Sequence, residues 1–95
     1  MFEWDPKKAS ANLTKHGISF EEASTVFADP NAMDGRDLHH SADERRFLRL
    51  GRSALGTVLM VAYTLRSTGN GETIRIISAR RASRKETAAY ASTED

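Results

Sequence analysis

The sequence predicts an α+β domain in which short helices cover one face of an antiparallel sheet. Two helix starts lie in the first third of the chain, and three runs of strand-forming residues, separated by short polar turns, follow from residue 44. A last helix start at Ser83 comes after the strands. A chain of 95 residues can bury one hydrophobic core, so we expect a single domain over residues 1–95 with a frayed tail at 92–95.

The composition narrows the class of protein. Apolar residues make up 39% of the chain, which is enough for a globular core, and there is no cysteine for disulfides or thiolate metal sites. The first residues lack the pattern of a signal peptide, and the longest apolar run, Val58 to Tyr63, is far too short to span a bilayer. We therefore expect a cytoplasmic protein that does not engage a membrane.

The charges are unevenly distributed along the chain. Residues 1–44 carry four Lys or Arg against nine Asp or Glu, a net charge of −5. Residues 45–85 carry ten Lys or Arg against Glu72 alone, a net charge of +9. Such a basic segment suggests a polyanion or an acidic protein as a partner. The alternative is an ordinary solvated face.

The first expected element is a short strand, in which Phe2 and Trp4 alternate with Glu3. A helix follows, because Asp5-Pro6 has the residue types of an N-cap and a first helical position. One side of this helix carries a narrow stripe of Ala9, Asn12, Leu13 and His16. Gly17 suits the left-handed conformation that ends a helix.

A second helix is expected from Ser19, which has capping-box spacing with Glu22. Ile18 and Ala23 have the spacing of a hydrophobic staple around this start. The helix ends at Asp29-Pro30. Its buried face consists of Phe20, Ala23, Val26 and Phe27. We expect the two helices to form a helical hairpin.

Residues 30–43 are polar and are interpreted as an irregular loop. Strands are then expected at 44–52, 57–66 and 72–80, and the middle one is central because it is apolar on both faces. Short connections make the three strands antiparallel neighbours, in a sheet of three to four strands. The last helix runs from Ser83 to about Tyr90.

Side-chain alternation assigns the two faces of this sheet. The face covered by helices is expected to hold Leu48, Leu50, Leu59, Val61, Tyr63, Ile74 and Ile76. The open face is expected to hold Arg45, Phe47, Arg49, Thr64, Arg66 and Arg75. Arginines with an aromatic ring among them can pair phosphates and stack a base. The last strand fits least well, because Ile77 and Ala79 fall on the open face, and a single bulge exchanges the faces.

The stretch from Ile74 to Arg81 organises the rest of the chain. It begins as an apolar, β-branched run and ends in two adjacent arginines, Arg80 and Arg81. Ser83 and Glu86 follow with the spacing of a capping box. A buried strand that delivers cations to its own end, beside a helix N-terminus, is well placed to hold an anion such as phosphate.

Segments spread over nearly the whole chain carry a family resemblance. They are FEWDPKK at 2–8, KHGI at 15–18, FEEA at 20–23, ERRF at 44–47, VAYT at 61–64 and IRIISARRA at 74–82, together with Asn12, Arg66, Glu86 and Tyr90. In this order and spacing the sequence resembles the BrnT family of toxins from bacterial type II toxin–antitoxin pairs. No single segment is specific, but the set is.

The resemblance implies a RelE-like fold and a metal-independent endoribonuclease that cuts RNA and inhibits translation. It also implies a cognate BrnA-like antitoxin, with two toxins and two antitoxins in the assembly. Operator DNA would be bound only through the antitoxin. The sequence also allows a second reading, a non-catalytic basic module that grips an acidic protein segment or RNA, because it contains no unambiguous acid–base pair.

A ribonuclease of this kind needs a base, an acid and cations around the phosphate. Arg80 and Arg81 are the first candidates for holding phosphate, and the alternative is that one of them forms a structural bridge with Glu86 or Glu44. Arg66 ends the neighbouring strand. It either converges with Arg80 or lies at the opposite edge, and an antiparallel meander favours the opposite edge.

Three further residues are catalytic candidates. His16 suits proton transfer, but it lies on the apolar stripe, which favours a partly buried helix cap. Lys15 points away from that stripe and can reach a substrate, or it serves only the helix dipole. Glu44 is a candidate general base, or the cross-strand partner of an arginine.

Other residues are candidates for RNA binding. They are Arg45, Phe47, Arg49 and Arg75 on the open face, and Tyr90 on the last helix. For Tyr90 the alternative, packing against the sheet, is more common. His39 and His40 lie among aspartates, but adjacent histidines project differently and no other ligand spacing is present, so we expect no metal and no cofactor.

Overall fold

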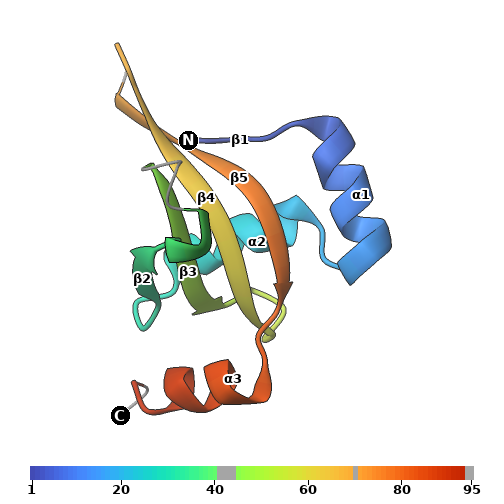
Figure 1. Cartoon of the computed structure of the whole chain (residues 1–95), viewed down its shortest axis with the longest axis vertical. Helices are drawn as coiled ribbons and strands as arrows, with labels where there is room; N and C mark the ends of the chain where they lie inside the picture. Colours follow the sequence, from blue (N-terminus) through green and yellow to red (C-terminus); the bar gives the residue numbers. More distant parts are fainter. Residues whose placement is uncertain (41–44, 70, 94–95) are drawn as a thin grey trace.

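The computed structural model describes residues 1–40, 45–69 and 71–93 (Figure 1). Its elements are β1 (Phe2–Glu3), α1 (Pro6–His16), α2 (Phe20–Ser24), the 3₁₀ helix η1 (Thr25–Ala28), β2 (Met33–Arg36), the 3₁₀ helix η2 (Leu38–His40), β3 (Arg46–Arg52), β4 (Val58–Thr68), β5 (Gly71–Arg81) and α3 (Arg84–Ala91). The fold is α+β, as the sequence predicts.

The strands form one sheet in the order β1-β5-β4-β3-β2. The meander β3-β4-β5 is antiparallel, as predicted from its short connections. Two edge strands extend it: β1 lies parallel to β5, and β2 lies antiparallel to β3 (Figure 1). The prediction of an irregular loop over 30–43 is therefore wrong for β2. All four of its residues are exposed, so it carries no alternating apolar signal, and only backbone pairing with β3 defines it as a strand.

The helix ends follow the local sequence signals. The Asp5 carboxylate accepts a hydrogen bond from the Lys7 N–H at 2.8 Å, and Gly17 adopts φ 72°, so α1 begins and ends as predicted. At α2 the Ser19 hydroxyl accepts from the Glu22 N–H at 3.0 Å. The Glu22 side chain does not complete the predicted box; its Oε2 accepts from the Ser53 hydroxyl at 2.7 Å and ties α2 to the β3–β4 turn.

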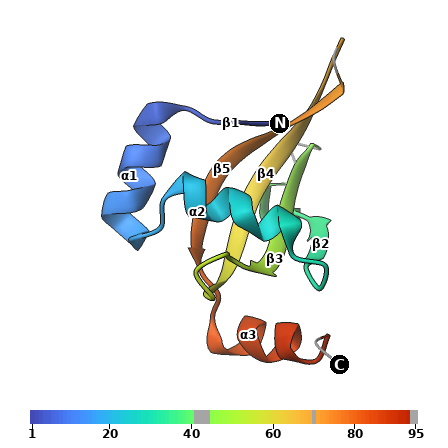
Figure 2. The same ribbon diagram turned by 180° about the vertical axis from the view of Figure 1, so that it is seen from behind.

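Figure 2 shows α2 crossing one face of the sheet and α1 lying beside the β5 edge, and the hydrophobic core lies between the α2 region and the strands. The core side chains come from the α2 region and from β4 and β5. They are Ile18, Phe20, Ala23, Val26, Leu59, Val61, Ile76 and Ala79. The assignment of Leu59, Val61 and Ile76 to the covered face is thereby confirmed.

On β3 the predicted face assignment is reversed. Arg49 lies on the covered face, where its Nε donates to the Val26 carbonyl at 3.0 Å and its guanidinium lies 5.0 Å from the centre of the Phe27 ring. Phe47 also lies on that face and stacks on Tyr63, with ring centroids 5.6 Å apart. Leu48 therefore faces the open side, together with Leu50.

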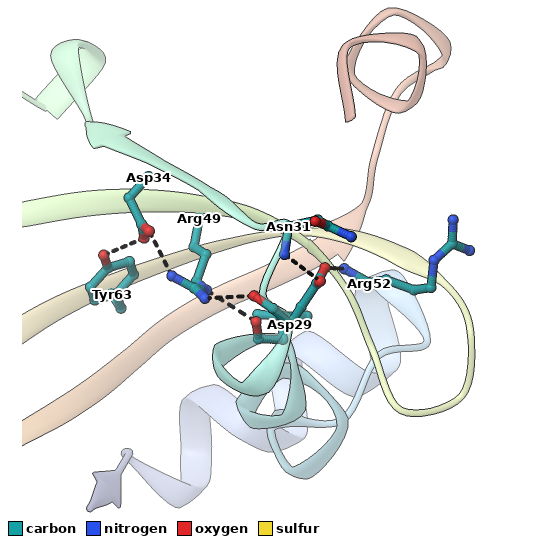
Figure 3. A network of polar contacts seen from close by, with 7 residues as sticks. Asp29, Asn31, Asp34, Arg49, Arg52 and Tyr63 are labelled. Carbon is teal, nitrogen blue, oxygen red and sulfur yellow. Dashed lines mark hydrogen bonds and ion pairs between the residues drawn. The ribbon is translucent and has the colours of Figure 1, made fainter. Parts of the chain in front are cut away.

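A polar network explains how the covered face accepts an arginine (Figure 3). The Arg49 guanidinium donates to the Asp34 carboxylate at 2.6 Å and to the Asp29 carbonyl at 3.3 Å, in addition to the Val26 carbonyl. The Tyr63 hydroxyl donates to the other Asp34 oxygen at 2.7 Å. Each Arg49 nitrogen has an acceptor, so these hydrogen bonds offset the cost of desolvating the guanidinium. Side-chain alternation alone cannot reveal such acceptors.

A bulge in β5 resolves the difficulty that Ile77 and Ala79 posed. Ala62 pairs with Ser78, but the next residue, Tyr63, pairs with Ile76, so Ile77 is left out of register. As a result Ala79 and Ile76 both lie on the covered face, each 1% exposed. Beyond the bulge Thr64 pairs with Arg75, and these two, with Arg66, lie on the open face as predicted.

The last helix, α3, packs against the end of the sheet. The Ser83 hydroxyl accepts from the Glu86 N–H at 3.1 Å and the Glu86 carboxylate accepts from the Ser83 N–H at 2.8 Å, so the predicted capping box is complete. Tyr90 is 2% exposed, and its hydroxyl donates to the Asp29 carboxylate at 2.6 Å. The Thr93 hydroxyl, after the helix, donates to the Tyr90 carbonyl at 2.7 Å.

Candidate functional site

A cleft of about 440 Å³ opens on the sheet face that the helices do not cover. It lies between the end of α1 and the η2 segment, and strands β3, β4 and β5 form its floor. Its lining consists of Lys15, His16, Asp37, His39, Arg46, Leu48, Met60, Ala62, Ser78, Ala79 and Arg80. The floor is apolar, and the rim carries three Lys or Arg and two histidines against one carboxylate.

The side chain of Asn12 fixes α1 beside this cleft. Asn12 is 7% exposed, and its Nδ2 donates to the carbonyls of Ile18 at 2.9 Å and Ala79 at 2.8 Å. Its Oδ1 accepts from the Ala79 N–H at 3.1 Å. The amide thus pairs with β5 as a neighbouring strand would. One turn later, Lys15 and His16 reach the rim of the cleft.

Asp37 organises the opposite rim. Its carboxylate is buried, with one oxygen 3.0 Å from Arg46 Nε and the other accepting from the His39 N–H at 3.2 Å. Sequence reasoning missed these residues, because the reversed β3 parity placed Arg46 on the covered face and His39 was considered only as a metal ligand. The same alternation, with the opposite parity, would have found Arg46.

Arg80 completes the cleft at the end of β5. Its Nη1 and Nη2 donate to the two Glu86 carboxylate oxygens at 2.8 Å and 3.0 Å. These hydrogen bonds lower the pKa of Glu86 to about 2 and raise the pKa of Arg80. Arg80 therefore forms the structural bridge with Glu86 that was its alternative, and it also lines the cleft; its role in holding phosphate stays a prediction.

Two of the remaining catalytic candidates, Arg81 and Arg66, are not among the residues that line the cleft. Arg81 donates to the His16 carbonyl at 3.3 Å and so supports the end of α1. Arg66 lies six residues along β4 from Met60, the partner of Arg80, which is roughly 20 Å away in an extended strand. There Glu3 holds both Arg66, at 3.0 Å, and Arg75, at 2.8 Å. Glu44 lies outside the described residues.

The predicted RNA-binding residues are also dispersed. Phe47 and Arg49 lie on the covered face, as described above. Arg45 is exposed just before β3 and is not among the residues that line the cleft. The ring of Tyr90 is packed in the interior and cannot stack a base in this position. Their roles in RNA binding stay predictions, and we do not include them in the candidate site.

Comparison with known proteins assigns the family. The family described as a ribonuclease toxin, BrnT, of type II toxin–antitoxin systems matches residues 4–86. The chain belongs to this family. BrnT proteins are ribonuclease toxins, so the family implies an RNA substrate and an antitoxin partner.

A solved structure shows the same fold. The crystal structure of the Brucella abortus ribonuclease toxin BrnT matches with a TM-score of 0.65 and 22% identity, over 88% of this chain and 99% of that chain. A comparison with curated proteins gave no match. The resemblance to BrnT noted in the sequence is thereby confirmed.

Two structural observations complete the description of this BrnT chain. Within residues 1–40, 45–69 and 71–93, no three His, Asp or Glu side chains are grouped as metal ligands would be. None of the helices in these ranges has the length and apolar character needed to cross a bilayer.

Proposed function

We propose that this BrnT chain is a RelE-like, metal-independent endoribonuclease whose active site is the open-face cleft. One observation carries the proposal: Lys15, Arg46 and Arg80, from three separate elements, converge on a single apolar-floored hollow. Cations around a low-dielectric cavity stabilise the extra negative charge of a phosphoryl transition state more strongly than the same cations in water.

The reaction we propose uses the RNA itself as nucleophile. The 2′-oxygen attacks the adjacent phosphorus while a base removes its proton, the bond from phosphorus to the 5′-oxygen breaks, and an acid gives that oxygen a proton. The products are a 2′,3′-cyclic phosphate and a 5′-hydroxyl. Every atom comes from the RNA, apart from the protons that the base and acid exchange, so the protein supplies position, charge and proton transfer.

The residues divide into two roles in this proposal. Arg46 and Arg80 hold the phosphate, and Lys15 adds positive charge at its edge. His16, from the α1 side, and His39, from the η2 side, serve as the proton-transfer pair, because imidazole can both donate and accept near neutral pH. These two histidines would supply the acid and the base that could not be identified in the sequence.

The assembly follows from the family by analogy. We propose that a BrnA-like antitoxin neutralises the toxin in the cytoplasm, in a complex of two toxins and two antitoxins. In this complex, operator DNA is contacted only by the antitoxin. Light scattering on the co-expressed pair measures the mass of the complex and so tests this stoichiometry. A mass equal to one toxin plus one antitoxin would contradict it.

The test of the function is cleavage of RNA by the purified chain, with and without EDTA. We expect cleavage to persist in EDTA and to fall about a hundredfold in Arg46→Ala, because one well-placed donor in such a site is worth a factor of 10² to 10³. Arg66→Ala, at the far end of β4, is the matched control and should cut normally. Cleavage that requires a metal, or that is equally impaired in both variants, contradicts the proposal.

The same assay tests the second candidate, a non-catalytic binding module. It is favoured by one observation: both arginines of the cleft are already paired with carboxylates, Arg46 with Asp37 and Arg80 with Glu86. Salt-sensitive binding of RNA that stays intact at long times would support this module and exclude the ribonuclease.

A further inference from the structure

The way Arg80 is held in the cleft gives Glu86 a role beyond its helix cap. Glu86 occupies the Nη1–Nη2 edge of the guanidinium with both carboxylate oxygens, at 2.8 Å and 3.0 Å. The second hydrogen of Nη1 goes to the Arg81 carbonyl at 3.2 Å. Two donors remain, Nε–H and the second hydrogen of Nη2, and neither has a hydrogen-bond partner among the described residues.

These two remaining donors lie on one edge of the planar guanidinium. Arginine has two such forks, and either can hold two oxygens of a phosphate. Because Glu86 takes one fork and leaves the other, the Arg80 side chain is anchored without losing its capacity for a bidentate phosphate contact. A long side chain that is already ordered loses less conformational entropy when it binds.

Glu86 is itself held in place by the start of α3. Its Oε1 accepts from the Ser83 N–H at 2.8 Å as well as from Arg80, and its own N–H donates to the Ser83 hydroxyl at 3.1 Å. The carboxylate therefore has little freedom to turn. Its pKa of about 2 also keeps it ionised throughout the pH range in which an enzyme of this kind would work.

We propose that Glu86 is a positioning residue of the cleavage site, which anchors Arg80 so that its Nε–Nη2 edge is presented to the substrate phosphate. This inference rests on the function proposed above. The competing interpretation is that the Arg80–Glu86 pair only docks α3, in which case its loss affects stability and leaves the chemistry unchanged.

A double-mutant cycle on the full chain distinguishes the positioning role of Glu86 from a role in docking α3 alone. Glu86→Gln keeps an oxygen for the Ser83 N–H but loses the charged, bidentate hold on Arg80. Glu3→Gln is the matched control, because Glu3 bridges Arg66 and Arg75 on the same sheet face, outside the residues that line the cleft. Both variants should lose a few degrees of Tm.

We expect Glu86→Gln to lower kcat on a labelled RNA about tenfold or more, with a smaller change in KM. A misplaced guanidinium stabilises the transition state less, whereas binding of the ground-state substrate changes less. Glu3→Gln should leave kcat unchanged. In an Arg80→Ala background, Glu86→Gln should have no further effect, since its partner is gone. Additive losses, or a kcat equal to or above that of the wild type in Glu86→Gln, would overturn the inference.

A binding measurement keeps this inference separate from the ribonuclease proposal. If the wild type cuts no RNA, the proposed function fails, and the affinity for a non-cleavable 2′-O-methyl RNA still tests the positioning. Arg80→Ala and the double variant should then lose affinity by the same factor, and Glu86→Gln alone by a smaller one. If Arg46→Ala abolishes cleavage while Glu86→Gln does not alter it, the function stands and the inference fails.

Discussion

What an arginine does in this protein depends on which of its N–H groups are already in use. Arg46 and Arg49 lie three residues apart on β3, on opposite faces. All three Arg49 nitrogens donate to protein acceptors, so the side chain links β3 to β2 and to the η1 region. Arg46 and Arg80 are also paired, but each keeps at least two N–H donors that have no hydrogen-bond partner among the described residues. Within the cleft, these two arginines can therefore hold a phosphate and remain anchored.

The depressed pKa of Glu86 predicts a specific pH dependence of stability. The ordinary pKa near 4.5 describes the unfolded chain, and the hydrogen bonds from Arg80 lower the pKa to about 2 in the fold. The stabilisation is therefore complete above about pH 5 and is lost as the pH falls from about 4.5 towards 2. For a partly exposed pair it is on the order of 1 kcal/mol. Chemical denaturation of wild type and Glu86→Gln between pH 7 and pH 3 checks this: the difference in free energy of unfolding should shrink towards acid, and a constant difference would contradict the assignment.

Among the helices and strands, the sequence best predicts the features that depend on interactions between residues close together in the chain. The N-caps at Asp5, Ser19 and Ser83 and the left-handed Gly17 are decided by a few neighbouring atoms, and all four are present. The strands of the meander were also found, because their apolar patterns are strong. The predictions that were wrong concern features that depend on residues distant in the sequence. Strand β2 is defined only by its pairing with β3. The face on which Arg49 lies depends on acceptors at Val26, Asp29 and Asp34, at least fifteen residues away.

The residues of the candidate site also divide into those that local sequence signals predict and those that depend on distant contacts. Lys15, His16 and Arg80 were found from their positions at the ends of a helix and a strand, where local signals place them well. Arg46 and His39 were missed, because their positions depend on the parity of β3 and on a buried carboxylate, Asp37, that holds both. The sequence could suggest cations near a helix terminus, but it could not determine which of the ten arginines share one cleft.

The docking of α1 on β5 depends on Asn12, which leads to a second prediction. Asn12→Ala leaves the Ala79 N–H and two carbonyls without partners in the interior, and each unsatisfied group is costly. We expect a loss of about 2–3 kcal/mol in the free energy of unfolding by urea denaturation. Leu13→Ala, at the neighbouring helical position, is 52% exposed and should change stability by much less. Equal losses in the two variants would show that the amide is not the attachment point.

Across the whole molecule, the acidic and basic halves of the chain neutralise each other by pairing. Four arginines of the strands are bound by carboxylates of the first half: Glu3 holds Arg66 and Arg75, Asp34 holds Arg49, and Asp37 holds Arg46. Much of the +9 segment is therefore used inside the fold. Arg45, Arg84 and Lys85 are exposed and do not line the cleft, so part of the segment also forms an ordinary solvated face.

This division predicts a modest salt dependence for RNA binding. If the phosphates of a single strand meet only Lys15, Arg46 and Arg80, the slope of log K against log salt should be about −2, since each neutralised phosphate contributes about −0.7. If the entire basic segment met RNA, ten cations would give a slope near −7. Fluorescence anisotropy with a 2′-O-methyl RNA from 50 to 300 mM salt distinguishes the two. Lys15→Ala should make the slope shallower by about 0.7, whereas Arg66→Ala should leave it unchanged. A steep slope that Arg66→Ala reduces would move the binding surface from the cleft to the far end of the sheet.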